Sequence, residues 1–157
     1  LSEISIVIGY LAGGIIRGLA VATVVTFIAL FFTQINIKHP FMTFFVIIMT
    51  AAVFSLAGLI NAIFAKKFDD IAVIPSFVLA PLTYLGGVFY TVSLLPDFWQ
   101  TLSRFNPILY MINSMRYSVI GISDVSIQNA LMMIVFFFIL LFTTAVILLK
   151  KGIGIRQ

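Results

Sequence analysis

Cysteine is absent from this chain of 157 residues, and charge is scarce, since Asp, Glu, Lys and Arg make up only 9% of the side chains. The lack of cysteine excludes any disulfide framework. One histidine and five acidic residues leave little for a metal site or a hydrolytic centre. The motifs G-x-x-x-x-G-K-[ST], H-E-x-x-H and G-x-S-x-G are also missing. We therefore expect no catalytic residue, no metal and no cofactor in this chain.

Apolar residues are abundant instead, at 62% of the sequence, whereas soluble domains contain about half. A fold of this size cannot bury so much apolar surface, so the excess is expected to face lipid. The net charge of +4 raises the question of nucleic acid. The basic residues, however, stand at the ends of apolar runs and not on one polar face. The composition predicts an all-α, polytopic membrane protein without a nucleic-acid partner.

The first apolar run extends over residues 4–33 and is interrupted only by Arg17. As one helix it would be about 45 Å long, which exceeds the ~30 Å hydrocarbon core. Glycines surround the arginine. We therefore predict an interfacial helix at 3–14 and a first span at 17–36, with Arg17 at the water boundary between them.

Three further segments reach the roughly 20 apolar residues that a span requires. They are 41–64, 71–91 and 127–149. Pro40 stands at a favourable first-turn position for the second span. The third contains Pro75 and Pro81 and ends near Gly86 and Gly87, so we expect a kink. Pro81 and the two glycines form a candidate hinge, although close helix packing explains the glycines equally well.

The stretch 92–126 is too apolar for an ordinary loop and too polar for a clean span. Pro96-Asp97 and Asn106-Pro107 are helix-start signals. We predict two short helices, 97–104 and 107–120, lying in or dipping into the membrane interface. Aromatic residues that suit this depth are Trp99, Tyr110 and Tyr117.

Basic residues indicate the orientation. With four spans, one side holds six of them and the other side three, and the richer side is expected to be cytoplasmic. The six are Arg17, Lys66, Lys67, Lys150, Lys151 and Arg156, and the three are Lys38, Arg104 and Arg116. A crossing by 107–122 would reduce the inner count to three. Four spans with both ends in the cytoplasm are therefore preferred.

Several polar residues have more than one interpretation. Asp97, Arg104 and Arg116 could order the short helices, hold lipid headgroups, or form ion pairs with one another or with Asp124. Asp70 is a candidate cap for the third span. Polar residues within the spans either bond across helices or line a pathway. These are Thr50, Ser55, Asn61 and Thr83. His39 is expected to be a loop residue.

Two segments carry a family resemblance. Residues 9–22 read GYLAGGIIRGLAVA, and residues 80–124 read APLTYLGGVFYTVSLLPDFWQTLSRFNPILYMINSMRYSVIGISD. The second combines a Gly-Gly-Val-Phe-Tyr run, Leu-Pro, an aromatic-rich Asn-Pro segment and Arg-Tyr before the final span. Both segments resemble ABC type-2 exporter permeases, the transmembrane subunits of ATP-binding cassette exporters, and the order and spacing agree over nearly the whole chain.

The resemblance implies a subunit of six spans, of which this chain is similar to the last four. Two spans would precede Leu1. Residues 3–14 would form a coupling helix on a separate ATP-binding subunit, which alone would hold ATP and magnesium. The implied coupling residues are Glu3, Ile4, Ser5, Ile8, Gly9, Tyr10 and Arg17. The short helices would be a re-entrant extracytoplasmic pair, with a gate formed by Asp97, Trp99, Arg104, Pro107, Tyr110, Arg116 and Tyr117.

The resemblance also implies two permease copies, forming a homodimer in a bacterial inner membrane. They would move an amphipathic, lipid-linked or glycan substrate outward. The main alternative is a membrane scaffold that anchors a cytoplasmic partner without transport. An ion channel or ion-coupled carrier is a weaker hypothesis, because the interiors of the spans contain no acidic residue.

Overall fold

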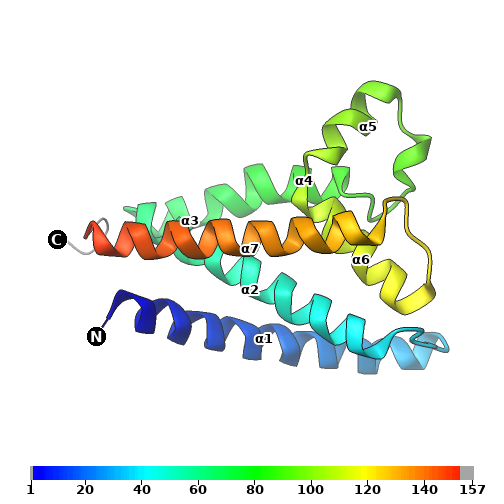
Figure 1. Ribbon diagram of the computed structural model, residues 1–157, viewed down its shortest axis with the longest axis horizontal. Coiled ribbons are helices and arrows are strands. Elements are labelled where there is room, and N and C mark those ends of the chain that lie inside the picture. Colours follow the sequence, from blue (N-terminus) through cyan, green and yellow to red (C-terminus); the bar gives the residue numbers. More distant parts are fainter. Residues whose placement is uncertain (1, 153–157) are drawn as a thin grey trace.

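The computed structural model describes residues 2–152, and within them the chain forms helices and turns without strands. The helices are α1 (Glu3–Phe32), α2 (Pro40–Phe64), α3 (Phe68–Ile74), the π-helical turn η1 (Pro75–Leu79), α4 (Ala80–Leu85), the 3₁₀ turn η2 (Val92–Leu94), α5 (Asp97–Arg104), α6 (Pro107–Ile120) and α7 (Ile127–Lys150). The start of α1, α3 and the end of α7 share one end of the bundle, the termini end. Helices α5 and α6 lie at the opposite end, the α6 end (Figure 1).

Helix α1 is one continuous helix of 30 residues, so the predicted break after Gly14 is wrong. Two of its glycines face α2 at close range. A Cβ on Gly18 would lie 2.6 Å from the Cβ of Ala51, and one on Gly14 would collide with the side chain of Ser55. Small residues let two helix backbones approach. These glycines therefore serve helix packing, and nothing in the segment ends the helix.

The span predicted to reach residue 36 ends earlier, at Phe32. The loop that follows is fixed on α6. Backbone N–H groups of Lys38 and His39 donate to carbonyls in the last turn of α6. The ring of His39 also stacks on Tyr117 at a centroid distance of 5.3 Å. His39 is thus a loop residue, as predicted, and its loop ties the α1–α2 connection to the α6 end.

A small apolar core holds the long helices together. One cluster joins α1, α2 and α7, and a second joins α2, α6 and α7. Because α2 contributes to both, it is the central helix of the bundle. The first cluster consists of Val7, Leu11, Ala52, Leu56, Leu59, Ala145 and Leu149. The second consists of Val53, Met111 and Ile134.

The third predicted span, 71–91, is a kinked helical stretch over 68–85, made of α3, η1 and α4. Pro75 has no N–H to donate to the carbonyl of Ile71, four residues earlier. Asn61 Nδ2 of α2 donates to that carbonyl instead, at 2.9 Å. The predicted kink is confirmed by the π-helical turn. A polar residue of one helix therefore compensates for a proline in its neighbour.

Side-chain and backbone signals define both ends of this stretch. At its start, the Asp70 carboxylate accepts hydrogen bonds from the N–H groups of Lys66 and Lys67, at 3.0 and 2.9 Å, so the predicted capping role is confirmed. At its end, α4 stops at Leu85, earlier than predicted. Gly87 follows with φ +78°, a left-handed conformation that favours glycine.

The two short helices occur where the start signals place them. Asn106 caps α6, because its Oδ1 accepts a hydrogen bond from the N–H of Ile108 at 3.0 Å. Its Nδ2 donates to the carbonyl of Leu82, in the middle of α4. Asn106 is buried, so one side chain both starts α6 and anchors it on α4. Helix α5 projects from the bundle (Figure 1).

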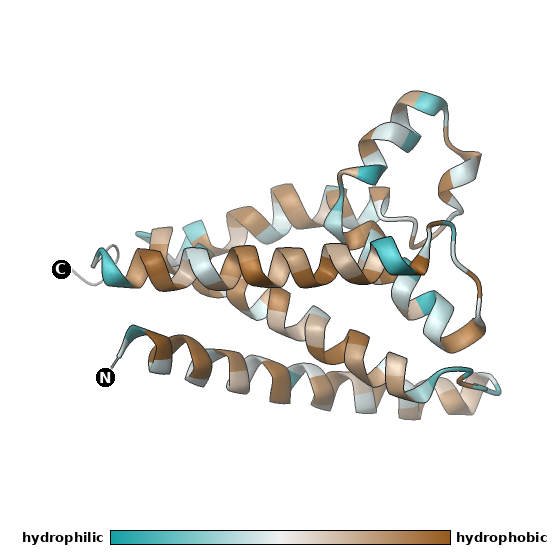
Figure 2. Ribbon diagram, viewed as in Figure 1, coloured by the Kyte–Doolittle hydropathy of each residue, from teal (hydrophilic) through white to brown (hydrophobic). Residues whose placement is uncertain are grey.

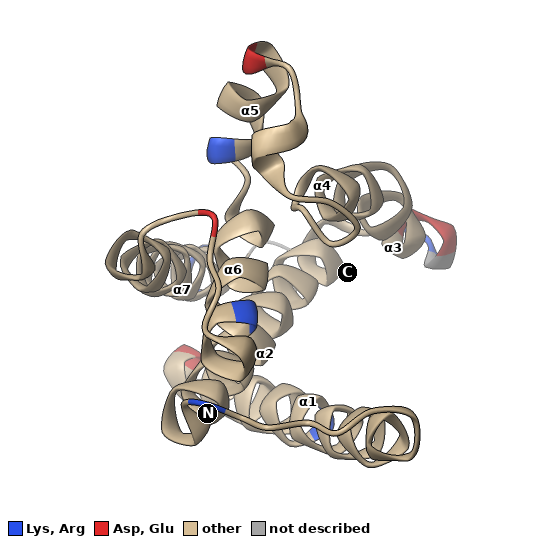
Figure 3. Ribbon diagram, turned by 90° about the vertical axis from the view of Figure 1, so that its right-hand side faces the viewer, with Lys and Arg blue, Asp and Glu red and all other residues tan. Residues whose placement is uncertain are grey.

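Within residues 2–152, three helices are long and apolar enough to cross a membrane, namely α1, α2 and α7. The stretch 68–85 is the broken counterpart of the remaining predicted span. Apolar residues dominate the long helices, whereas hydrophilic ones gather at helix ends and loops (Figure 2). Most charges likewise lie at helix ends and in loops (Figure 3). Within helices, the exceptions are Arg17 of α1 and Arg116 of α6. Arg156, counted with the inner basic residues, lies outside the described residues.

Candidate functional site

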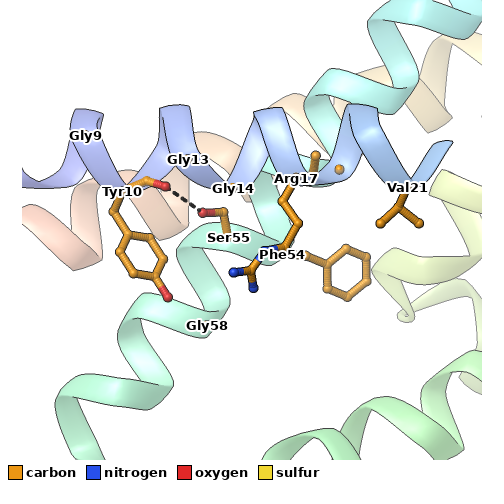
Figure 4. A pocket seen from close by; sticks show the side chains of 11 residues that line it. Gly9, Tyr10, Gly13, Gly14, Arg17, Val21, Phe54, Ser55 and Gly58 are labelled. Carbon is orange, nitrogen blue, oxygen red and sulfur yellow. Dashed lines mark hydrogen bonds between the residues drawn. The ribbon is translucent and has the colours of Figure 1, made fainter. Parts of the chain in front are cut away.

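A groove of about 710 Å³ runs between α1 and α2 (Figure 4). The Arg17 side chain extends from α1 toward α2 and ends near Phe54 and Gly58. Ser55 Oγ donates to the carbonyl of Tyr10 at 3.4 Å across the two helices, which confirms cross-helix bonding for Ser55. The groove is lined by Gly9, Tyr10, Gly13, Gly14, Arg17, Gly18, Val21, Ala51, Phe54, Ser55 and Gly58. None of these residues is acidic, so the groove presents one positive charge beside hydroxyl groups.

Glycines keep the polar part of this groove open. Cβ atoms added to Gly9 and Gly13 would meet nothing within 4 Å. At Gly58, the only close atom would be the hydroxyl of Tyr10, at 3.9 Å. Helix α1 thus uses one glycine pair to pack on α2 and leaves another pair facing free space.

A second groove, of about 410 Å³, continues from the first toward α6. The two share Gly18, Val21, Ala51 and Phe54. The second is almost wholly apolar, since Thr50 is its one polar lining residue. Its remaining lining residues are Ala22, Val25, Val46, Ile47, Ile108, Met111, Ile112 and Met115. Together the grooves join a polar section with an apolar section along one face of the bundle.

The predicted coupling residues all lie on α1, but they do not form one cluster. Gly9, Tyr10 and Arg17 line the first groove. The others lie nearer the termini end, outside it. They are Glu3, Ile4, Ser5 and Ile8, of which Ile4 and Ile8 are about half exposed, at 46% and 54%. Arg17 stands at the middle of α1 and not at a boundary between two helices, so that part of the sequence prediction is wrong.

A polar cluster at the α6 end centres on Arg116. Its Nη1 lies 3.0 Å from Asp124 Oδ2, and its Nη2 donates to the carbonyl of Gly87 at 2.6 Å. Asn113, which is fully buried, accepts the backbone N–H of Asp124 at 2.8 Å. Of the predicted alternatives for Arg116, the structure shows the ion pair with Asp124. The cluster joins the turn after α4, helix α6 and the loop before α7.

The remaining gate candidates are spread over α5 and α6. Asp97 and Trp99 lie on α5 and are exposed. The hydroxyl of Tyr110 donates to the carbonyl of Arg104 at 2.6 Å, which joins α6 to the end of α5. Pro107 is in the first turn of α6. Tyr110 thus contacts the Arg104 backbone, but neither residue contacts the Arg116 cluster through a hydrogen bond. The gate candidates therefore do not form one site.

The hinge candidates have distinct environments. Pro81 lies in the first turn of α4. A Cβ on Gly86 would lie 2.9 Å from Cδ1 of Ile112 and 3.1 Å from Cγ2 of Ile108. Gly86 therefore allows close packing on α6, one of its two predicted roles, whereas Gly87 makes the turn and offers its carbonyl to Arg116.

Two features of these sites are absent from the sequence prediction. Asn113 was not singled out, although an asparagine within an apolar helical segment often signals a buried hydrogen-bonding role. The groove between α1 and α2 was also missed, because it depends on which glycines face a neighbouring helix. Among residues 2–152, no three metal-ligating side chains are grouped.

Comparison with known proteins identifies the family of this chain. The model of the ABC-2 type transporter family matches residues 1–120, a range that includes every residue lining the two grooves. The chain belongs to this family of membrane transport permeases, which confirms the resemblance seen in the sequence.

Several individual proteins are similar to this chain. The chain is similar to "Inner membrane transport permease YadH" of Escherichia coli strain K12, at 54% identity over 120 residues, 76% of this chain and 47% of that protein. The protein of the same name from Shigella flexneri matches equally. "Nodulation protein J" of Rhizobium leguminosarum bv. trifolii is 29% identical over 76 residues, 48% of this chain and 29% of that protein. The chain thus spans about half the length of the curated relatives it matches most extensively. No solved structure matches it.

Proposed function

We propose that this chain forms part of the permease subunit of an ATP-binding cassette exporter in a bacterial inner membrane. The single observation that carries the proposal is the ABC-2 family match over residues 1–120. The 54% identity to a protein named as an inner membrane transport permease supports the location. Two permease copies would move an amphipathic, lipid-linked or glycan substrate outward. A separate subunit would bind ATP and magnesium and supply the energy.

The ATP-binding subunit would dock at the termini end. Exposed Ile4 and Ile8 and the partly exposed Glu3 are on the first turns of α1. The basic pairs Lys66–Lys67 and Lys150–Lys151 belong to the same end of the bundle. Such basic residues favour the cytoplasmic side. A partner at this end would contact α1, which lines the first groove.

The α6 end would close the extracytoplasmic side. Helices α5 and α6 are short, and α5 carries exposed Phe98 and Trp99, which suit the interface between lipid and water. The Arg116 cluster fixes α6 to the turn after α4 and to the loop before α7. We assign these helices a re-entrant, gating role.

Transport is tested with the complete permease and its ATP-binding subunit in inside-out vesicles. The probe is a fluorescent phospholipid. Dithionite added outside the vesicles quenches the probe in the outer leaflet only. We expect ATP-dependent movement of the probe, and its loss in the double variant Ile4→Asp/Ile8→Asp. Ile122→Asp is the matched control, because Ile122 is an exposed isoleucine in a loop at the opposite end of the bundle.

The scaffold hypothesis gives a different result. A scaffold would bind the ATP-binding subunit, but no ATP-dependent movement would follow for the phospholipid, a lipid-linked sugar or an amphipathic dye. If Ile4→Asp/Ile8→Asp left both subunit assembly and ATP hydrolysis unchanged, the docking surface on α1 would be rejected.

A further inference from the structure

We propose that the two connected grooves form one binding site for a membrane amphiphile with an anionic head group, held by Arg17. The head would occupy the polar groove between α1 and α2, and the tail would extend into the apolar groove toward α6. The orientation of this site in the membrane rests on the proposed function, whereas the binding itself does not.

Charge is the first argument. A guanidinium group within an apolar helix is costly unless an anion or water neutralises it. The Arg17 side chain extends into the groove (Figure 4), and no lining residue is acidic. The neighbouring polar groups are the hydroxyls of Tyr10 and Ser55. Guanidinium groups favour phosphate and carboxylate ligands because they donate paired hydrogen bonds. The groove therefore complements an anion.

The apolar continuation is the second argument. A free anion would occupy only the first groove. The first groove, however, opens directly into the second, because Gly18, Val21 and Phe54 line both. The second groove then passes between Val25 of α1 and Met111 and Met115 of α6. Methionine side chains are flexible and adapt to irregular apolar ligands. A polar section that leads directly into an apolar one matches a head group with its tail.

Depth is the third argument. If Phe32 marks the outer boundary of the hydrocarbon core, about 20 residues of helix cross it, and the inner boundary falls near Gly13. Arg17 is one turn further along α1, and helical side chains lean toward the N-terminus. Its guanidinium would thus reach the level of inner-leaflet head groups. The apolar groove extends toward the membrane centre, as the tail of an inner-leaflet lipid does.

The test uses the complete permease in phosphatidylcholine nanodiscs. The probes are phosphatidic acid and phosphatidylcholine, each with the same photoreactive acyl chain. Labelled peptides are identified by mass spectrometry. We expect phosphatidic acid to label the α6 segment around Met111 in preference to phosphatidylcholine. Arg17→Gln should reduce this labelling about tenfold, the loss expected for a charge-assisted hydrogen bond.

Matched variants test three requirements separately: the positive charge of Arg17, the space for the lipid tail, and correct folding. Arg17→Lys should keep part of the labelling, because the positive charge remains but the paired hydrogen-bond donors are lost. Lys38→Gln removes an exposed positive charge outside both grooves and should change nothing. Ala22→Trp should block the apolar groove and reduce labelling. Val24→Trp, on the same helix but outside both grooves, should not. Gel filtration and helical content verify that each variant is folded.

Four results would overturn the proposal. Equal labelling by both lipids, or labelling that Arg17→Gln does not change, would remove the role of Arg17. Full competition by millimolar inorganic phosphate would indicate a site for free anions. A cross-link from the groove to another polypeptide, with no lipid labelling, would show that a protein helix fills it. No step requires ATP or transport, so Arg17-dependent labelling without transport would reject only the proposed function.

Discussion

Arg116 and Asp124 form an ion pair of 3.0 Å that closes a loop of the chain between α6 and the start of α7. The side chains are only 22% and 14% exposed, so the pair is more shielded from solvent than a surface salt bridge. The same guanidinium donates to the carbonyl of Gly87. One side chain therefore connects three segments at the α6 end.

The first prediction concerns the contribution of Arg116 to stability. Arg116→Ala should destabilise the folded permease by about 2 kcal/mol, because it removes two charge-assisted hydrogen bonds. Arg116→Lys should recover only part of this loss, since an ammonium group cannot copy the two-pronged geometry. Thermal unfolding in detergent measures the effect. Arg104→Ala is the control, because Arg104 is exposed. Equal stability of Arg116→Ala and the native protein would contradict the prediction.

Alanine substitutions should divide the glycines of α1 into two classes. Gly18→Ala would bring a Cβ within 2.6 Å of Ala51, and overpacking of this kind costs about 1–3 kcal/mol. Gly13→Ala meets nothing within 4 Å and should be neutral or slightly stabilising, because alanine favours helix. Melting temperatures of the two variants, compared with that of the native protein, measure the difference. Equal destabilisation by both variants would show that another surface covers Gly13.

Asn61 and Pro75 should be energetically coupled. Asn61→Ala removes the part-buried hydrogen bond to the carbonyl of Ile71, at a cost of about 0.5–1.5 kcal/mol. In a Pro75→Ala background, the restored N–H can serve that carbonyl, so the same substitution should cost clearly less. A double-mutant cycle on unfolding free energies gives the coupling. Additive effects would mean that Asn61 acts independently of the proline.

Single cysteines report the orientation, because the native chain contains none. Asp97→Cys on α5 should react with a membrane-impermeant maleimide added to intact cells. Lys150→Cys, at the end of α7, should react only after permeabilisation. The cysteine-free protein is the control. Labelling of Lys150→Cys from outside would reject the cytoplasmic placement of the termini end.

Local signals made much of the helix pattern predictable. Pro40 and Asn106-Pro107 start helices where their missing N–H groups or side-chain caps predict. Asp70 caps α3 for the same reason. These effects depend on residues within one turn, so a single sequence contains them. The two short helices at 97–104 and 107–120 follow from such signals alone.

Effects that depend on a neighbouring helix were harder to predict. Gly14 and Gly18 suggested a break in α1, because glycine lowers helix propensity. Their actual role requires Ser55 and Ala51 on the opposite helix. The partner of Arg116 was likewise one of several possibilities, and only the fold brings Asp124 to it. The groove at Arg17 belongs to the same category, because it exists between two helices.

The two helical stretches beside α2 differ in regularity. Helix α1 and the stretch 68–85 both contact α2, but α1 has an unbroken hydrogen-bond ladder over 30 residues, while the other contains Pro75 and a π-helical turn. An axial push at Glu3 would be transmitted to Phe32 through one continuous helix. The same push along 68–85 would be absorbed by bending at the π-helical turn. A motor at the termini end would therefore move the far end of α1 as a rigid rod while its counterpart yields.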